Sequence, residues 1–311
     1  MATTDSSVVA GAVTFTVQSK VLENLRGELT FADPARAEQG TFDKGTDTIM
    51  FLSYADLATM TTPLAEGVNT GITRKSLTQA SVTVDTQVYG DIVDITDLAK
   101  VKSPVDLAAI ASERVTRQAA ESIDKITRDE IALGGTPVYQ TDDTTRVGLA
   151  STDYVTAADM MKLRAKMVAA KVPFGPDGLY TFWTHPYVTL DMRSEAVSSA
   201  GAWMDVNRYS RPDQIMRGEV GTYHGFHIVE IPNAPTASST TTVFLSFAFG
   251  RIKGWGAGEL QTLQVYHTPP GGKGDELHQY ESLGWKVNFG VAPLNNSYYY
   301  RFECATSLGS A

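Results

Sequence analysis

The first half of the chain shows a strand-like alternation of apolar and polar positions. Between residues 48 and 96 the alternation has period two, with Val82 and Val84 on one face of a strand. The parity of the pattern changes near Gly90, which predicts a β-bulge at that glycine. Two long strands are therefore expected here.

The connection between those strands, residues 60–78, is rich in Thr, Gly, Pro and Asn. It is too long for a tight turn and predicts an extended two-stranded flap. Isolated two-stranded ribbons are only marginally stable in water. A flap of this kind implies another surface on which it lies.

A long helix is expected over residues 105–133, with Ser103-Pro104 at its cap and first turn and Gly134-Gly135 at its end. At 1.5 Å per residue, this helix spans about 43 Å. Four residues are expected on its apolar side: Leu107, Ile110, Ile123 and Ile126. The helix would act as a spine.

Charges of alternating sign recur every four residues along this helix, at Glu113, Arg117, Glu121, Lys125 and Asp129. Opposite charges one turn apart stabilise a helix modestly. A solvated face of ion pairs is the favoured interpretation. The alternative is a charged seam between subunits.

The flanking regions are an N-terminal arm, residues 1–44, and a compact α/β region beyond residue 155. In the α/β region Thr156 resembles a helix start, and Pro186 opens a second helix after a buried strand at 179–183. Further strands are expected in five places: 220–231, 243–249, 260–266, 285–291 and 298–302.

Composition and charge exclude several classes of protein. The 311 residues include 42% apolar and 20% charged residues, which is typical of globular chains and not of disordered ones. The formal net charge of -9 disfavours a protein that coats nucleic acid. The single cysteine, Cys304, cannot form an intrachain disulfide, which indicates a reducing compartment. No apolar run is long enough to span a bilayer, and the start does not resemble an export signal.

Motifs for chemistry are weak. No GxSxG sequence is present, and Cys304 is expected to be a buried, idle thiol. His224 and His227, flanked by Glu219 and Glu230, form the one candidate metal cluster, but an offset of three places the imidazoles on opposite faces of a strand. The remaining histidines are interpreted as a helix-entry residue, His185, and two isolated residues, His267 and His278.

Two glycine-rich stretches also lack a chemical interpretation. Gly254, Gly256 and Gly258 are not followed by a helix, and residues 271–274 do not have P-loop spacing. Both stretches are interpreted as turns. The aromatic residues at 298–302 are interpreted as strand packing, not base stacking.

The order of these parts resembles the tailed-phage major capsid proteins, specifically the coat-protein family of the coliphage N-four type. The resemblance extends from about Thr46 to Phe302. Short motifs carry it: TPLAEG (62–67), YGD (89–91), TDL (96–98), AAESID (119–124), AD (158–159), HP (185–186), GEVG (218–221) and GWK (284–286).

The resemblance implies an α+β chain with the Hong Kong 97 fold. The implied divisions are an N-terminal arm (1–44), an extended loop (45–97), a peripheral domain (98–155), an axial domain (156–258) and C-terminal strands that return to the peripheral domain (259–311). It also implies no enzymatic activity, no cofactor and no metal. The subunit contacts expected in the flap are Pro63, Leu64, Glu66, Gly67, Arg74 and Lys75. The five charged residues of the spine helix are added to them.

The implied function is self-assembly into hexamers and pentamers of an icosahedral shell around double-stranded DNA, in the virion, after assembly in the host cytoplasm. Portal, scaffolding and decoration proteins are the expected further partners. Covalent joining of Lys75 to Asn288, Asn295 or Asn296 of a neighbour is a minor hypothesis. The alternative functions are another structural virion protein, such as a tail tube or decoration subunit, and a metal-dependent hydrolase.

Overall fold

The computed structural model describes thirteen stretches of the chain: 31, 38–41, 48–54, 57–61, 75–140, 145–175, 177–198, 203–205, 219–239, 241–251, 254–271, 275 and 277–309. Most of the arm lies outside these residues. Five expected contact residues of the flap also lie outside them: Pro63, Leu64, Glu66, Gly67 and Arg74.

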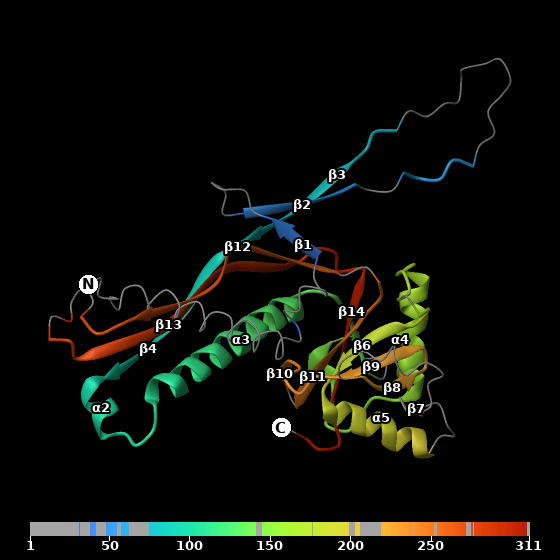
Figure 1. Cartoon of the computed structure of the whole chain (residues 1–311). Helices are drawn as coiled ribbons and strands as arrows, with labels where there is room; N and C mark the ends of the chain where they lie inside the picture. Colours follow the sequence, from blue (N-terminus) through green and yellow to red (C-terminus); the bar gives the residue numbers. More distant parts are fainter. Residues whose placement is uncertain are drawn as a thin grey trace.

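The expected pair of long strands is confirmed as a ribbon that runs into a sheet. Strand β2 (Thr48–Tyr54) pairs antiparallel with β3 (Gln79–Asp85). Strand β4 (Gln87–Thr96) continues the chain into a four-stranded sheet of order β1-β12-β13-β4. Its other members are β1 (Glu38–Thr41), β12 (Trp255–Thr268) and β13 (Tyr280–Pro293). Figure 1 shows the ribbon projecting away from the rest of the molecule.

The bulge expected at Gly90 is wrong. The ladder between β4 and β13 runs without a register shift from Gln87 to Thr96. The change of parity falls at Thr86, the single residue between β3 and β4. Gly90 is needed for a different reason, because a Cβ there would lie 2.5 Å from the backbone oxygen of Trp285. The glycine permits close strand approach.

The spine helix is confirmed, but its start differs. A short helix, α2 (Asp97–Lys102), precedes α3 (Leu107–Leu133). The side chain of Asp106 caps α3 by accepting hydrogen bonds from the backbone of Ala108 and Ala109, so Ser103 is the C-cap of α2 instead. Gly134 ends α3 as expected. Asp106 is the N-cap of α3 in place of Ser103 because its side chain can accept from two free N–H groups of the first turn.

Helix α3 lies along one face of the four-stranded sheet (Figure 1). Its buried residues include Val115, Ala119 and Ile131, whereas Ile110 is 44% exposed. The sheet supplies the facing side chains, Trp285, Val287, Phe289 and Val291, which share one face of β13 as expected. The apolar stripe is therefore made partly by alanines, which permit close approach of helix and sheet.

A second, eight-stranded sheet forms the other part of the molecule. Its path is β5-β14-β11-β6-β9-β8-β7, with β10 beside β11. These strands are β5 (Thr136–Tyr139), β6 (Tyr180–Thr184), β7 (Trp203–Asp205), β8 (Glu219–Tyr223), β9 (Phe226–Glu230), β10 (Thr236–Ser238), β11 (Thr242–Phe249) and β14 (Tyr299–Cys304). Helices α4 (Ala157–Ala169) and α5 (Pro186–Ser198) accompany this sheet, and a 3-10 turn, η3 (Arg146–Gly148), precedes α4.

The starts of α4 and α5 follow their sequence signals. Thr156 and Asp159 form a complete capping box at α4. At α5 the backbone N–H of Tyr187 donates to Nδ1 of His185 at 3.2 Å. The interpretation of His185 as a helix-entry residue is therefore confirmed.

Strand pairing differs from the expected grouping at three places. β14 pairs with β11 and β5, so residues 299–304 and 136–139 lie in the larger sheet. Gly256 and Gly258 are not turn residues, because they pair in register within β12. Tyr300, Phe302 and Cys304 face the core of the larger sheet, which includes Phe182 and Phe244, whereas Tyr299 packs in the core that contains Ile131 of α3.

Candidate assembly surfaces

The β2–β3 ribbon carries exposed apolar side chains on its outer face. Met50, Leu52 and Tyr54 are 58%, 53% and 60% exposed. The opposite face is covered, since Val84 is 1% exposed and the ring of Phe51 lies against Gly256 of β12. One face of the ribbon thus belongs to the core of its own chain, and the other is left to solvent.

Three further exposed apolar residues lie just beyond the paired part of the ribbon, on either side of the loop. They are Leu57, Met60 and Leu77, each more than half exposed. Lys75, the one expected contact residue of the flap that is described, donates a hydrogen bond from Nζ to the backbone oxygen of Ala58. Lys75 therefore ties the two sides of the ribbon together within one subunit.

Two of the three asparagines considered for covalent joining have local roles, in the turn between β13 and β14 and at the end of α3. The Oδ1 atom of Asn295 accepts from the backbone N–H of Ser297, and that of Asn296 accepts from Gly135. Asn288 lies within β13, where its Oδ1 is buried without a hydrogen-bond partner in the described part of the chain.

The charged ladder of α3 is realised only in part. Arg117 Nε donates to Glu121 at 3.0 Å, one turn away, and both side chains are more than half exposed. Asp129 pairs with its neighbour Arg128 at 2.7 Å, a contact that the four-residue spacing did not predict. Glu113 and Lys125 are exposed. This face is exposed to solvent in the single chain, and its role as a solvated face or as a seam between subunits stays a prediction.

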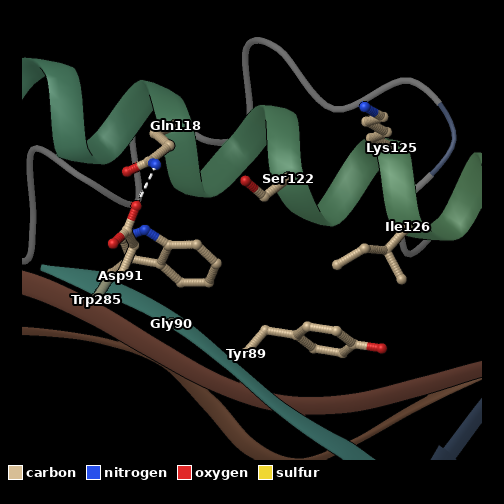
Figure 2. Close-up of a pocket in the computed structure, with 8 residues that line it drawn as sticks. All are labelled: Tyr89, Gly90, Asp91, Gln118, Ser122, Lys125, Ile126 and Trp285. Carbon is tan, nitrogen blue, oxygen red and sulfur yellow. Dashed lines mark hydrogen bonds between the residues drawn. The ribbon is translucent and has the colours of Figure 1, made fainter.

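A hollow of about 340 Å³ lies between α3 and the four-stranded sheet. Helix α3 contributes Gln118, Ser122, Lys125 and Ile126, and the sheet contributes Tyr89, Gly90, Asp91 and Trp285. Figure 2 shows the aromatic rings below and the polar side chains of α3 above. The sequence could not reveal this hollow, because its walls come from segments far apart in the chain.

The electrostatics of the hollow are mixed. Gln118 Nε2 donates to Asp91 Oδ2 at 2.5 Å, and this bond together with the backbone N–H of Ile92 lowers the pKa of Asp91. Burial and the negative charge of Glu130 raise the pKa of Tyr89. The Nε1 atom of Trp285 is buried without a hydrogen-bond partner among the described residues.

The histidine cluster does not become a metal site in the described residues. His224 lies in the turn between β8 and β9 with φ of 46°, followed by Gly225 at 90°. His227 Nε2 lies 3.7 Å from Asp177, and Glu230 ends β9. No group of three or more metal-ligating side chains occurs in the parts of the chain that were described. The side chain of Glu219 lies outside them.

His267 is not isolated, contrary to expectation. Its Nε2 lies 2.5 Å from Glu281 Oε1, and Glu281 also pairs with Lys100 of α2. Burial and the positive charge of Lys100 lower the pKa of His267. Glu281 thereby links α2 to β12 and β13. Only the strand register brings residues 267 and 281 together.

A buried ion group was also missed. Glu303 is fully buried and accepts from Arg146 at 2.6 and 2.9 Å and from Arg301 at 2.7 Å. Arg301 also donates to the backbone oxygens of Ala132 and Gly134, at the end of α3. The available signal was the alternation of β14, which places Arg301 and Glu303 on one strand face. Cys304 is buried beside it, and burial raises the pKa of its thiol, as expected for an idle cysteine.

Comparison with known proteins identifies the chain. A family model described as phage capsid protein matches residues 79–301. A search of curated proteins found no match. Within the described ranges, no helix combines the length and apolar character that crossing a bilayer requires.

Solved capsid structures share the fold. The capsid of Ralstonia phage GP4 matches with a TM-score of 0.70 at 13% identity, over 90% of this chain and 89% of that one. The capsid of cyanophage P-SCSP1u matches at 0.63 and 16% identity, over 87% of both chains. The head structure of Helicobacter pylori bacteriophage KHP40 matches at 0.63 and 9% identity, over 90% and 91%. The chain therefore belongs to the phage capsid protein family, as a shell-forming major capsid protein with the Hong Kong 97 type of fold.

Proposed function

We propose that this capsid protein assembles with copies of itself into the hexamers and pentamers of an icosahedral shell that encloses double-stranded DNA, and that it catalyses no reaction. The exposed outer face of the β2–β3 ribbon carries the proposal. Three large apolar side chains, Met50, Leu52 and Tyr54, are each more than half exposed on a structure that is marginal by itself. Burial against a neighbouring subunit removes that exposure.

The proposed subunit contacts are the flap and the charged face of α3. In the flap they are Pro63, Leu64, Glu66, Gly67, Arg74 and Lys75, and on α3 they are Glu113, Arg117, Glu121, Lys125 and Asp129. The proposed division into arm, extended loop, peripheral domain, axial domain and returning strands keeps the expected ranges, with β5 and β14 placed in the larger sheet. Many modest contacts of this kind sum to a durable shell, because each subunit is held at several points.

Portal, scaffolding and decoration proteins are proposed as further partners, and the host cytoplasm as the place of assembly. The net charge of -9 suits a container for DNA, because a weakly repulsive wall lets the genome slide during packing. Charge on the inner wall of the assembled shell tests this last point, and a net-basic lining contradicts it.

The substitution Leu52→Ser tests the proposed role of the ribbon in assembly, and Leu190→Ser is the matched control. Leu190 lies on α5 and is 47% exposed, close to the 53% of Leu52. Full burial of a leucine contributes roughly 1.5–3 kcal/mol, so the half of Leu52 still exposed contributes about 1 kcal/mol per subunit contact. We expect both variants to fold, and only Leu52→Ser to raise the subunit concentration at which shells appear.

The readout is size-exclusion chromatography followed by electron microscopy over a range of subunit concentrations. If Leu52→Ser assembles at the same concentration as Leu190→Ser and the parent chain, the ribbon is not an assembly contact. Failure of the parent chain to form shells, capsomers or tubes, alone or with the other head proteins, would contradict the proposed assembly itself.

A further inference from the structure

Phe31 is the one residue before β1 that the structure describes, and it is fully buried. Its backbone N–H donates to Oδ1 of Asp124 at 2.7 Å, across 93 positions of the chain. Asp124 lies on α3 and is 5% exposed. A buried carboxylate is costly unless it accepts hydrogen bonds, so this bond stabilises Asp124 in the interior and holds Phe31 in place. The segment before β1 is thereby attached to α3.

The ring of Phe31 contacts the larger sheet. It meets the indole of Trp183, on β6, edge-on at a centroid distance of 5.3 Å. It also meets the ring of Phe247, on β11, edge-on at 6.2 Å. Edge-on packing is a favoured arrangement of aromatic rings, and both partners are only 1% exposed. These four residues, Phe31, Asp124, Trp183 and Phe247, are called the Phe31 anchor.

The anchor joins two elements that otherwise meet near the end of α3. Helix α3 packs mainly on β13 and β4 of the smaller sheet. Further hydrogen bonds from α3 to the larger sheet or its turns lie in the last two turns of the helix or just after it. They join Arg128 to Asn233, Tyr299 to Ile131, and Arg301 to Ala132 and Gly134. Phe31 adds a contact one turn earlier, closer to the middle of the helix.

We propose that the Phe31 anchor is a conformational device that couples two properties of the subunit. One is the attachment of the N-terminal arm to its own subunit, and the other is the placement of α3 against the larger sheet. When Phe31 leaves, Asp124 loses a donor, and Trp183 and Phe247 lose a packed ring. An empty space in a close-packed core is unfavourable, so helix and sheet must move to fill it. Release of the arm and movement of α3 are therefore one event.

Coupling of this kind is reciprocal. A partner that binds the released arm shifts the subunit toward the state in which α3 is loosened, and a displacement of α3 shifts the arm toward release. The coupling is a property of the single subunit. It holds whether or not the proposed contacts between subunits are correct, and it is measured before any assembly takes place.

Phe31→Ala in the full, unassembled chain tests the coupling. Amide hydrogen exchange reports the opening of α3, β6 and β11, and trypsin cleavage after Arg26 and Arg36, which flank Phe31 in the sequence, reports release of the arm. We expect the substitution to raise both rates together, by about tenfold or more. Phe31→Leu keeps part of the apolar volume and should raise both rates by a smaller, common factor.

Two further variants separate the anchor from ordinary core packing. Phe226 is the matched control, since it is also fully buried but lies on β9 in the other core. Phe226→Ala should speed exchange around β9 and leave cleavage at Arg26 and Arg36 as in the parent chain. Asp124→Asn acts from the helix side. It keeps an acceptor oxygen and removes the charge, so both rates should rise by roughly twofold to tenfold, because a charge-assisted hydrogen bond is the stronger one.

Each outcome bears on the proposal. Faster cleavage with unchanged exchange in α3, or faster exchange with unchanged cleavage, overturns the coupling. An even rise in exchange over the whole chain, alike in Phe31→Ala and Phe226→Ala, overturns it as well, because Phe31 is then an ordinary core residue. If Phe31→Ala does not fold, Phe31→Leu and Asp124→Asn provide the same comparison. Shell formation by the parent chain tests the proposed function separately.

Discussion

The buried ion group around Glu303 allows a sharp stability prediction. Glu303→Gln keeps the shape of the side chain and removes the charge that holds Arg146 and Arg301. Removing one partner of a buried ion pair typically costs about 3–5 kcal/mol, because an uncompensated charge stays buried.

The structure argues for a loss at or just below the lower end of that range. The side chain of Arg146 is 33% exposed and can turn toward water, whereas that of Arg301 is 12% exposed and retains the carbonyls of Ala132 and Gly134 as acceptors. The substituted glutamine side chain would also keep a carbonyl oxygen for one arginine. We therefore expect a loss of about 2–3 kcal/mol in the free energy of unfolding, or roughly 30-fold to 150-fold in the folding equilibrium.

Equilibrium urea unfolding of the unassembled subunit measures this loss, with the fluorescence of the four tryptophans as signal. Glu121→Gln is the matched control, because it makes the same chemical change in the exposed pair with Arg117. That variant should lose less than about 0.5 kcal/mol. Equal losses in the two variants would refute the reasoning, since the Glu303 group would then be no more buried in solution than a surface pair.

Three further predictions concern local structure. Thr156→Ala should lose about 1 kcal/mol because it breaks the capping box of α4, whereas Thr145→Ala should be nearly neutral, since Thr145 makes no capping hydrogen bond at η3; thermal unfolding compares them. Burial lowers the pKa of His185, so its contribution to stability is complete above about pH 6.5 and is lost as the pH falls through the lowered value, when Nδ1 can no longer accept from the start of α5. Unfolding at pH 7.5 and 5.5 should therefore show a smaller difference for His185→Asn than for the parent chain, and equal differences would exclude a role for this cap. Gly90→Ala should lose about 1–3 kcal/mol in urea unfolding, because its Cβ would lie 2.5 Å from the oxygen of Trp285; an unchanged midpoint would show that the strands move apart freely.

The sequence was informative wherever the signal is local. The end of α3 at Gly134, the capping box at Thr156 and the apolar face of β13 all follow from residues within a few positions of one another. The start of α3 was misplaced by two residues, because Ser103, Pro104 and Asp106 offer competing caps and only the path of the chain selects among them.

Contacts between residues that are far apart in the chain could not be predicted from such local signals. Glu303 is 157 positions from Arg146, and Asp91 is 27 from Gln118. Gly90 was assigned a bulge because its neighbours change parity, but the break lies at Thr86, where the chain passes from the ribbon to the sheet. Alternation records which face of a strand is covered, and a strand that changes partners can change its covered face without a bulge.

The sequence predicted the types of surface that are proposed for assembly, but not all of the residues that form them. The sequence indicated a flap and a charged helix face, and most of the expected flap residues lie outside the described part of the chain. It did not indicate Met50, Leu52 and Tyr54, because alternation alone cannot tell which of two apolar faces the subunit covers for itself.

Covered and uncovered apolar groups lie on different surfaces of this chain, and this separation bears on how it functions. The cores beside the two sheets are built around fully buried aromatic residues, such as Trp255 of β12 and Phe302 of β14. Helix α2, by contrast, has no buried residue, and its Leu98 and Val101 are 57% and 83% exposed. The ribbon covers the apolar side chains of one face and exposes those of the other. A subunit of this kind can fold before it assembles, because its stability does not depend on the surfaces that it later covers. Substitutions on the ribbon or α2 should accordingly change the assembly threshold with little change in unfolding, while substitutions such as Glu303→Gln should do the reverse.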